Sequence, residues 1–313
     1  MTTDKLLLEK DGALAWIVFN QPEKRNAVSQ EMWQAMAEYV AECEKDDAIR
    51  VVILRGAGDH FVSGADISQF KDRRRNAVSQ EMWEAMPAHV EELTNDDAIR
   101  VVILRGGGDR SFVSGADISQ FKDNRKNAAD EAEYRRISGA GSEALSHLGK
   151  PLLAMIRGFC IGGGVSIALT CDLRIAADDA RFGIPAARLG LGYHYKGMDK
   201  LMHLVGPAYT KELFFTARTD FSAQDALRMG LVNQVVPKAD LERFTRDYAL
   251  KIAENAPLTI RSAKASADQL VKAPAERDLA LLDKLITDCF NSEDYQEGVK
   301  AFGEKRRPQF RGR

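Results

Sequence analysis

Short apolar runs alternate with longer amphipathic stretches along most of the chain. Residues 5–20 contain two apolar runs around Asp11 and Gly12, which predicts a β-hairpin. The segment IRVVILRG occurs at 49–56 and again at 99–106, and its nearly unbroken apolar character is typical of a strand covered on both faces. Further strands are expected at 152–160, 173–178 and 231–237, with helical patterns between them and after residue 210. This order predicts an α/β fold closed by a C-terminal helical region.

The two IRVVILRG strands belong to a longer repeat. Residues 26–72 recur as residues 76–123, with most aligned positions identical. Each copy predicts a helix, a strand and a turn, with Ser29 or Ser79 as the helix N-cap. Pro87 is expected to break or kink the second helix, where the first copy has Ala37. Solenoid proteins need three or more units and the sequence has no third copy, so we interpret the repeat as a recent tandem duplication.

Composition and charge exclude several classes of protein. The 313 residues are 45% hydrophobic and 29% charged, as in ordinary soluble globular proteins. With 44 basic and 46 acidic residues the net charge is −2, so no global field attracts nucleic acid or an anionic membrane. The first 19 residues carry five charges and no apolar run approaches the ~20 residues of a membrane span. Four scattered cysteines form no CxxC pair. We therefore expect a cytoplasmic protein.

A run of three glycines gives the strongest chemical signal. Gly162, Gly163 and Gly164 lie between an expected strand and the first turn of an expected helix. Glycine allows close approach of the backbone to a ligand, and a helix start offers unpaired N–H groups at its positive dipole end. Such donors can hold a phosphate or a developing oxyanion. The alternative is a tight turn that packs against a neighbouring strand.

The turn FVSGADI gives a second signal and occurs in both copies, at 61–67 and 112–118. In the second copy Gly115 and Ala116 follow a buried strand, and Asp117 is placed to cap the next helix. The amide of Ala116 would then be free to face a ligand. The alternative is a plain turn from strand to helix with an aspartate cap.

Together these runs resemble the enoyl-CoA hydratase/isomerase (crotonase) superfamily. Further ordered matches are RNAVS, FGIPAARLGLG, FSAQDALRMGLVNQVVP and SEDYQEGVKAFGEKRRPQF, so the resemblance covers essentially the whole chain apart from one repeat unit. It implies a ββα spiral core over residues 1–209 and a mainly helical region over 210–313 that completes the CoA site. It also implies an acyl-CoA thioester as substrate, homotrimers or dimers of trimers, no metal, and no cofactor besides the coenzyme A of the substrate.

The resemblance also assigns roles to the two glycine-containing turns. In the family, one amide from SGADI and one from the middle of the GGG run form an oxyanion hole for the thioester carbonyl. Carried over, these are Ala116 and Gly163, with Ala65 as the duplicate candidate. The residues expected to contact the substrate beside them are Gly115, Asp117, Ile118, Gly162 and Gly164.

Two carboxylates of the family's hydratases are missing. The family has one glutamate three residues after the middle glycine and another directly after FGxP. These positions hold Ser166 and Ala186 here, and neither residue can act as a general base near neutral pH. Hydration through paired carboxylates therefore lacks both of its groups.

An aromatic residue follows near the expected acyl end. Tyr193 falls where methylmalonyl-CoA decarboxylases, a branch of the same family, carry a tyrosine. A tyrosine hydroxyl can orient a carboxylate or supply a proton, although Tyr193 could equally be a packing aromatic. That branch has a histidine in the oxyanion turn where this chain has Ala116, so the match is partial. Other polar groups nearby are His194, Tyr195 and Lys196.

Basic residues are expected to bind the nucleotide end of the thioester. The family places them just before NAV and near the C-terminus, where this chain has Lys24, Arg25, Lys305 and Arg306. Phe302 is expected to contact the adenine from the same or a neighbouring subunit, and Arg73–Arg75 would substitute if the second copy is in use. Each basic residue could instead be a solvated surface charge.

The copies differ in ways that favour the second as the working one. Its turn GGGDRSFVSGAD has the family's usual length, whereas GAGDHFVSGAD is one residue shorter, and the family often has the proline found at Pro87. We predict that Ala116 serves the hole and that the first unit is the insertion. The leading functional hypothesis is an acyl-CoA lyase that performs malonyl-type decarboxylation. The alternatives are an enoyl-CoA hydratase or isomerase with another base, and a catalytically inert CoA-ester-binding protein.

Overall fold

The structure is a computed structural model. It describes residues 4–22, 26, 30–46, 48–49, 51–57, 77–115 and 128–313. The predicted N-cap Ser29 and the first copy's FVSGADI turn lie outside these residues. Among the described helices, none combines the length and the apolar character that crossing a bilayer requires.

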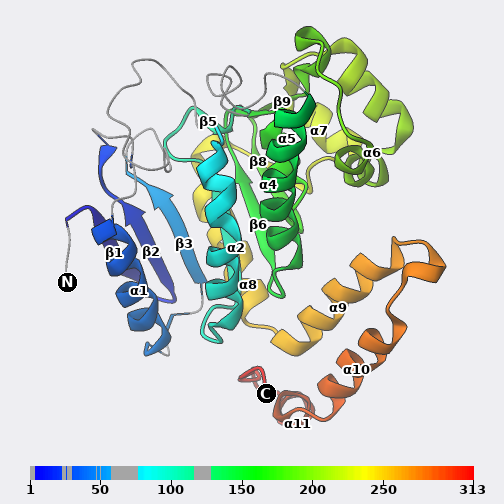
Figure 1. Ribbon diagram of the computed structural model, residues 1–313. Helices are drawn as coiled ribbons and strands as arrows, with labels where there is room; N and C mark the ends of the chain where they lie inside the picture. The colour runs from blue at the N-terminus through cyan, green and yellow to red at the C-terminus, as the bar shows by residue number, and fades with distance from the viewer. Residues whose placement is uncertain are drawn as a thin grey trace.

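A seven-stranded sheet forms the centre of the molecule (Figure 1). The predicted hairpin consists of β1 (Leu6–Asp11) and β2 (Leu14–Phe19), which pair antiparallel around Gly12 at φ 57°. All other pairings in this sheet are parallel, in the order β1-β2-β3-β4-β6-β8-β11. The remaining strands are β3 (Val51–Gly56), β4 (Val101–Arg105), β6 (Leu152–Ile156), β8 (Leu173–Ala177) and β11 (Gln234–Val236). The two IRVVILRG runs are confirmed as buried strands, whereas the single strand expected at 152–160 is divided: β6 ends at Ile156, and Phe159–Ile161 pair in a second sheet.

The two copies of the repeat fold into the same unit and lie side by side. The first gives α1 (Gln30–Glu44) and β3, and the second gives α2 (Gln80–Asn95) and β4. In α2 the Ser79 hydroxyl accepts a hydrogen bond from the Met82 amide, as its N-cap role predicts. Val51 of β3 pairs with Leu14 on one side and with Val101 on the other, so the first copy's strand is inserted between β2 and β4. Each copy therefore widens the strand layer and the helix layer together.

Pro87 does not break the second helix, contrary to one form of the prediction. Helix α2 continues through Pro87 to Asn95. A proline cannot donate to the carbonyl four residues earlier, which here belongs to Trp83. Helix α4 (Ala128–His147) approaches at this point: a Cβ on Gly141 would lie 2.9 Å from the Trp83 carbonyl oxygen and 2.7 Å from its ring. Helix α4 therefore packs against α2 beside the Trp83 carbonyl, to which Pro87 cannot donate a hydrogen bond.

A second, four-stranded sheet stands at one end of the first. Its order is β10-β9-β7-β5, formed by β10 (Phe221–Ser222), β9 (Arg181–Gly183), β7 (Phe159–Ile161) and β5 (Ser111–Val113). Strands β5, β7 and β9 run parallel. Among the described residues, β5 is the strand of this sheet that the repeat contributes, and it belongs to the second copy.

Helices cover both faces of the large sheet. One core lies under α1, α2 and α4, and a second core lies between the sheet and α8 (Leu241–Ala253). Beside the small sheet lie α5 (Gly163–Ala168), α6 (Tyr195–Thr216), which is kinked at Gly206, and α7 (Ala223–Met229). Short 3₁₀ turns occupy Pro185–Leu189, Lys238–Asp240 and Pro274–Glu276.

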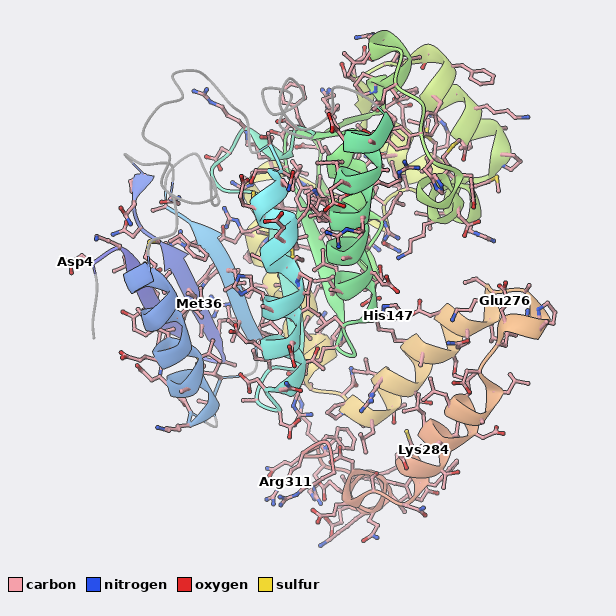
Figure 2. The ribbon with its side chains drawn as sticks, in the orientation of Figure 1. Asp4, Met36, His147, Glu276, Lys284 and Arg311 are labelled. Atoms are coloured by element: carbon pink, nitrogen blue, oxygen red, sulfur yellow. The ribbon has the colours of Figure 1, made fainter. Side chains whose placement is uncertain are left out.

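The C-terminal helices form an arm that extends away from the sheets (Figures 1 and 2). The arm consists of α9 (Pro257–Leu270), α10 (Leu279–Phe290) and α11 (Glu293–Gly303). Its surface carries large exposed apolar side chains, including Phe290 and Phe302. Helix α6 runs through the expected boundary at 209 and 210, and β10 and β11 join the two sheets from beyond it. The part of the chain that is only helical therefore starts after β11.

Removing residues 26–75 should leave a folded protein. Strand β4 has the same sequence, VVILR, as β3, so it can pair with β2 in the register that β3 now occupies. We expect one cooperative unfolding transition, followed by circular dichroism during heating. A shortened chain with helical signal but no cooperative transition would show that the two copies have become structurally interdependent.

Candidate active site

The two predicted glycine-containing turns meet at the ends of neighbouring strands. In the parallel pair β5–β7, Ser111 lies opposite Phe159 and Val113 opposite Cys160. The turn that begins at Ser114 and the glycine run that begins at Gly162 therefore leave the small sheet at the same edge. Residues about 50 positions apart in sequence are brought together by this pairing.

Gly162 shapes the second turn. Its backbone has φ 54° and ψ −111°, a conformation that favours glycine. Its amide donates to the Gly183 carbonyl at 2.8 Å, and its own carbonyl accepts from Ser166 at 3.2 Å. The turn is thus attached to β9 on one side while it starts helix α5 on the other.

The amide of Gly163 is available for a ligand. Gly163 is the first residue of α5, where an N–H has no acceptor within the helix. Within the part of the chain that the structure describes, this amide donates no hydrogen bond. Gly163 is only partly exposed, so a bound oxygen would be shielded from much of the solvent. This is the environment that the predicted oxyanion role requires.

The first turn packs directly on the start of α5. A Cβ on Gly164 would lie 2.1 Å from the Val113 carbonyl oxygen, so only glycine fits there. Gly115, at φ 121°, comes close to the Ile161 carbonyl, and its own carbonyl accepts from the Val78 amide at 3.0 Å. Ala116 follows Gly115 but lies outside the described residues. The other predicted site residues outside them are Ala65, Asp117, Ile118, Lys24, Arg25 and the substitutes Arg73–Arg75.

The two positions that lack carboxylates lie beside this turn. Ser166 is half-buried in α5, and Ala186 is buried in the 3₁₀ turn Pro185–Leu189. The pairing of Ile161 with Gly183, together with the Gly162–Gly183 hydrogen bond, holds the FGIPA segment against the glycine run. Ser166 thus lies in the helix that follows the glycine run and Ala186 three residues after Gly183, and their place in a substrate site stays a prediction.

Tyr193 has a well-defined packing contact. Its ring is half-buried and meets Phe214 edge-on, with centroids 5.0 Å apart and an interplanar angle of 73°. The next residue, His194, stacks at 4.3 Å on Tyr195, which is largely exposed. Tyr193 thus packs against Phe214, as the packing alternative predicted, and a catalytic role for Tyr193 stays a prediction.

The described residues predicted to bind the nucleotide end are Phe302, Lys305 and Arg306, in and after helix α11. Figure 1 shows α11 at the opposite end of the molecule from α5. Phe302 is 87% exposed, and Lys305 is exposed at φ 54°. Arg306 is paired with Glu297 at 2.6 Å, and this contact lowers the pKa of Glu297 to about 2. Arg306 therefore serves the local structure of the arm.

Two glycines that the sequence reading did not single out help to shape the site. A Cβ on Gly158 would lie 2.1 Å from the Arg110 carbonyl oxygen, and one on Gly183 would lie 2.0 Å from that of Arg218. Each glycine lies in or beside a short strand, a position that often marks a close backbone approach. That signal was present in the sequence, but it does not reveal which backbone approaches.

Known proteins resemble this chain over its full length. A sequence model of the enoyl-CoA hydratase/isomerase family matches residues 9–74 and 68–313. The short-chain-enoyl-CoA hydratase of Clostridium acetobutylicum is 36% identical over 307 residues, with 98% of this chain and 97% of the relative covered. The (E)-benzylidenesuccinyl-CoA hydratase of Thauera aromatica is 37% identical over 307 residues, with 97% and 98% covered.

A solved structure with the same fold confirms the predicted architecture. An enoyl-CoA hydratase/carnithine racemase from Magnetospirillum magneticum superimposes with a TM-score of 0.66 at 27% identity. The comparison covers 100% of this chain and 97% of that one. The crotonase-like α/β core with C-terminal helices is therefore confirmed.

Replacing Gly164 with alanine should disturb the site through its packing. The added methyl group would overlap the Val113 carbonyl, so α5 or β5 must shift. We expect the free energy of unfolding to fall by about 1–3 kcal/mol in chemical denaturation. Gly139→Ala is a suitable control because a Cβ there meets nothing within 4 Å in helix α4, and it should be neutral or stabilising by up to about 1 kcal/mol. Equal effects of the two substitutions would contradict the packing argument.

Proposed function

The chain belongs to the enoyl-CoA hydratase/isomerase family, and from this premise we propose that it binds an acyl-CoA thioester and stabilises an enolate formed from it. The observation that carries the proposal is the Gly163 amide, which has no acceptor among the described residues and lies beside the turn through Gly115. One donor from each turn, Gly163 and Ala116, would hold the thioester oxygen.

The chemistry of a thioester explains why such donors matter. Conjugate addition, deprotonation and decarboxylation next to the carbonyl all move negative charge onto its oxygen. Fixed N–H groups stabilise that charge without having to reorient during the reaction, and the loss of one such donor typically costs ~3–4 kcal/mol in the barrier. The site therefore supports a class of reactions rather than a single one.

Within this class we propose addition of water to an enoyl-CoA, the reaction named for the relatives from Clostridium acetobutylicum and Thauera aromatica. These relatives favour hydration over the malonyl-type decarboxylation that the sequence alone predicted. Because Ser166 and Ala186 supply no carboxylate, the proposed enzyme depends on its oxyanion donors and on water activated by another group. Its hydration rate should consequently be low for the family.

Decarboxylation of a malonyl-type thioester is the second candidate. The observation in its favour is the same absence of carboxylates at Ser166 and Ala186, since loss of CO₂ creates the enolate without a base. Tyr193 would orient the departing carboxylate through its hydroxyl group.

Assembly into trimers or dimers of trimers belongs to the proposal. The exposed apolar side chains of α10 and α11 need a covering surface, and α11, which carries Phe302, lies at the opposite end of the molecule from α5, which begins at Gly163. A neighbouring copy would bring them to the nucleotide end of the thioester. No cofactor beyond the coenzyme A of the substrate is proposed.

Assays with crotonyl-CoA and methylmalonyl-CoA test the reaction. Hydration of crotonyl-CoA without release of CO₂ supports the leading proposal, and release of ¹³CO₂ from labelled methylmalonyl-CoA supports the second. Tight binding of both thioesters without turnover would instead identify a catalytically inert CoA-ester-binding protein. Failure to bind either thioester in calorimetry would end the proposal.

Restoring both carboxylates should raise the hydration rate. In Ser166→Glu/Ala186→Glu the two acids would lie beside the glycine run, where they can activate water. General acid–base catalysis typically contributes about 10²–10⁴-fold, and we expect a gain of at least the lower value in kcat/KM for crotonyl-CoA. The matched control is Ser166→Gln/Ala186→Gln, which has the same size without the charge. A gain in both variants would point to shape rather than to acid–base chemistry.

Proline substitution tests which copy supplies the second amide. Ala116→Pro removes the proposed donor and should lower kcat by about 10²–10³-fold, because one oxyanion donor is lost. Ala65→Pro, the equivalent change in the first copy, should leave kcat near that of the unmodified chain. Greater damage from Ala65→Pro in the same steady-state assay would reverse the assignment.

A further inference from the structure

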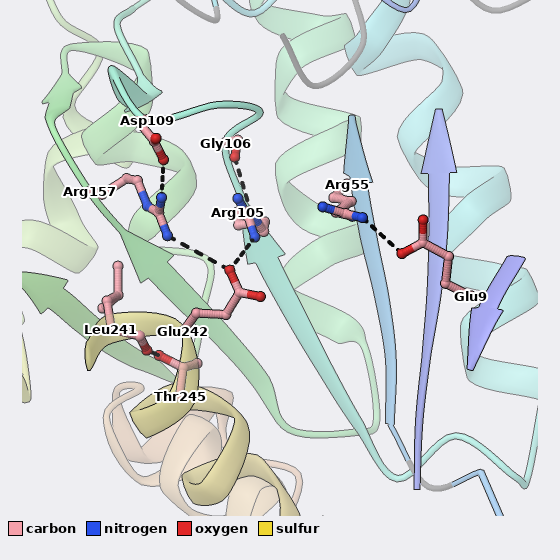
Figure 3. Close-up of polar contacts among 9 residues, drawn as sticks. All are labelled: Glu9, Arg55, Arg105, Gly106, Asp109, Arg157, Leu241, Glu242 and Thr245. Carbon is pink, nitrogen blue, oxygen red and sulfur yellow. Dashed lines mark hydrogen bonds and ion pairs between the residues drawn. The ribbon is translucent and has the colours of Figure 1, made fainter. Parts of the chain in front are cut away.

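A chain of charged groups joins the loops that lead into the small sheet (Figure 3). Arg157 is ion-paired with Asp109 and lies 3.9 Å from Glu242 of α8. Glu242 also accepts from Arg105 of β4 at 3.1 Å, and Arg105 donates to the Gly106 carbonyl at 3.3 Å. The side chains of Arg105 and Arg157 are only 8% and 14% exposed, whereas their partners Glu242 and Asp109 are 47% and 71% exposed.

This chain of contacts lies where the polypeptide passes from one sheet to the other. Residues 106–110 connect β4 of the large sheet to β5 of the small one. Arg157 and Gly158 make the corresponding connection from β6 to β7. The Arg157–Asp109 ion pair therefore links the two corners from which β5 and β7 start.

The strands that follow these corners are short. Each has three residues, and their register shifts between Ser111 and Val113. At the corner, the Phe159 amide donates to the Arg110 carbonyl at 3.2 Å, and Gly158 approaches the same carbonyl closely. Beyond the far ends of the strands come Gly115 and Gly163. Only one short strand therefore separates each corner from its turn.

We propose that Arg157 is a positioning residue for the thioester site, setting the distance between the Gly115 turn and the Gly163 amide through Asp109 and Glu242. The inference rests on the proposed function. A guanidinium suits this place because one amino group can donate to the loop carboxylate of Asp109 while the other lies within ion-pair distance of the helix carboxylate of Glu242. Oxyanion stabilisation requires such precision, because displacement by about 1 Å can cost 10²-fold in rate.

Three variants test the role of Arg157. Arg157→Met removes both contacts, Arg157→Lys keeps the charge with a different geometry, and Asp109→Asn removes the charge of an exposed partner with little risk to folding. Arg55→Met is the matched control: Arg55 occupies the position in the first copy that Arg105 has in the second, and it pairs with Glu9 at 2.8 Å, apart from Asp109.

Two measurements with crotonyl-CoA separate positioning from general stability. We expect Arg157→Met to lower kcat by about 10–100-fold with KM nearly unchanged, because the oxyanion donors act mainly on the transition state. The carbonyl stretching frequency of bound ¹³C-labelled crotonyl-CoA, measured by difference infrared spectroscopy, should move back toward its value in solution. Arg157→Lys and Asp109→Asn should show smaller changes of the same kind, and Arg55→Met should show none.

The outcomes distinguish failure of the positioning role of Arg157 from failure of the proposed function. Suppose that the unmodified chain shifts the carbonyl frequency and that Arg157→Met and Asp109→Asn each shift it by as much as the unmodified chain does. The positioning role is then overturned, and the proposed function stands. The same holds if Arg55→Met changes the frequency as much as Arg157→Met. If the unmodified chain leaves the frequency at its solution value, both the oxyanion site and the role of Arg157 are overturned.

Discussion

The close approach of β5 and β7 is the constraint on which the proposed site depends. Gly164 must lie against the Val113 carbonyl and Gly158 against that of Arg110, at separations that leave no room for a side chain. This approach places two turns at one edge of the small sheet, where the helix start at Gly163 leaves an amide without an acceptor among the described residues. Backbone groups are well suited to such a task because the surrounding fold fixes them before a ligand arrives. The ion pairs around Arg157 extend the same constraint to α8.

This chain differs from the family pattern in the side chains near the proposed oxyanion amides. The fold and the glycines are those of a hydratase/isomerase, yet Ser166 and Ala186 stand at the two carboxylate positions. A site with oxyanion donors and no paired acids can still stabilise an enolate, but it gives less help to an attacking water. The relatives favour hydration, whereas the local chemistry suits any reaction that makes its enolate without a strong base. Both kinds of reaction require stabilisation of negative charge on the thioester oxygen.

The repeat shows how a sheet can accept an additional unit. One copy supplies a helix and a strand together, so both layers widen and parallel pairing continues from β2 through β3 to β4. The second copy contacts later parts of the chain: Arg100 donates to the Phe310 carbonyl, and the Leu93 carbonyl accepts from Lys150. It also supplies β5, next to the glycine run. That the first copy is the insertion stays a prediction.

The sequence by itself determined the strands of the large sheet, the repeat, the family resemblance and the glycine run, because apolar runs and glycines report local requirements of the backbone. It also identified the missing carboxylates at Ser166 and Ala186. Tertiary structure alone decided that α2 continues through Pro87, that Tyr193 packs on Phe214, and that α11, which carries Phe302, lies at the opposite end of the molecule from α5. It likewise revealed which backbones approach Gly158 and Gly183, and how Arg157 joins Asp109 to Glu242. These features depend on contacts between residues distant in sequence, and no local pattern of side chains encodes a distant partner.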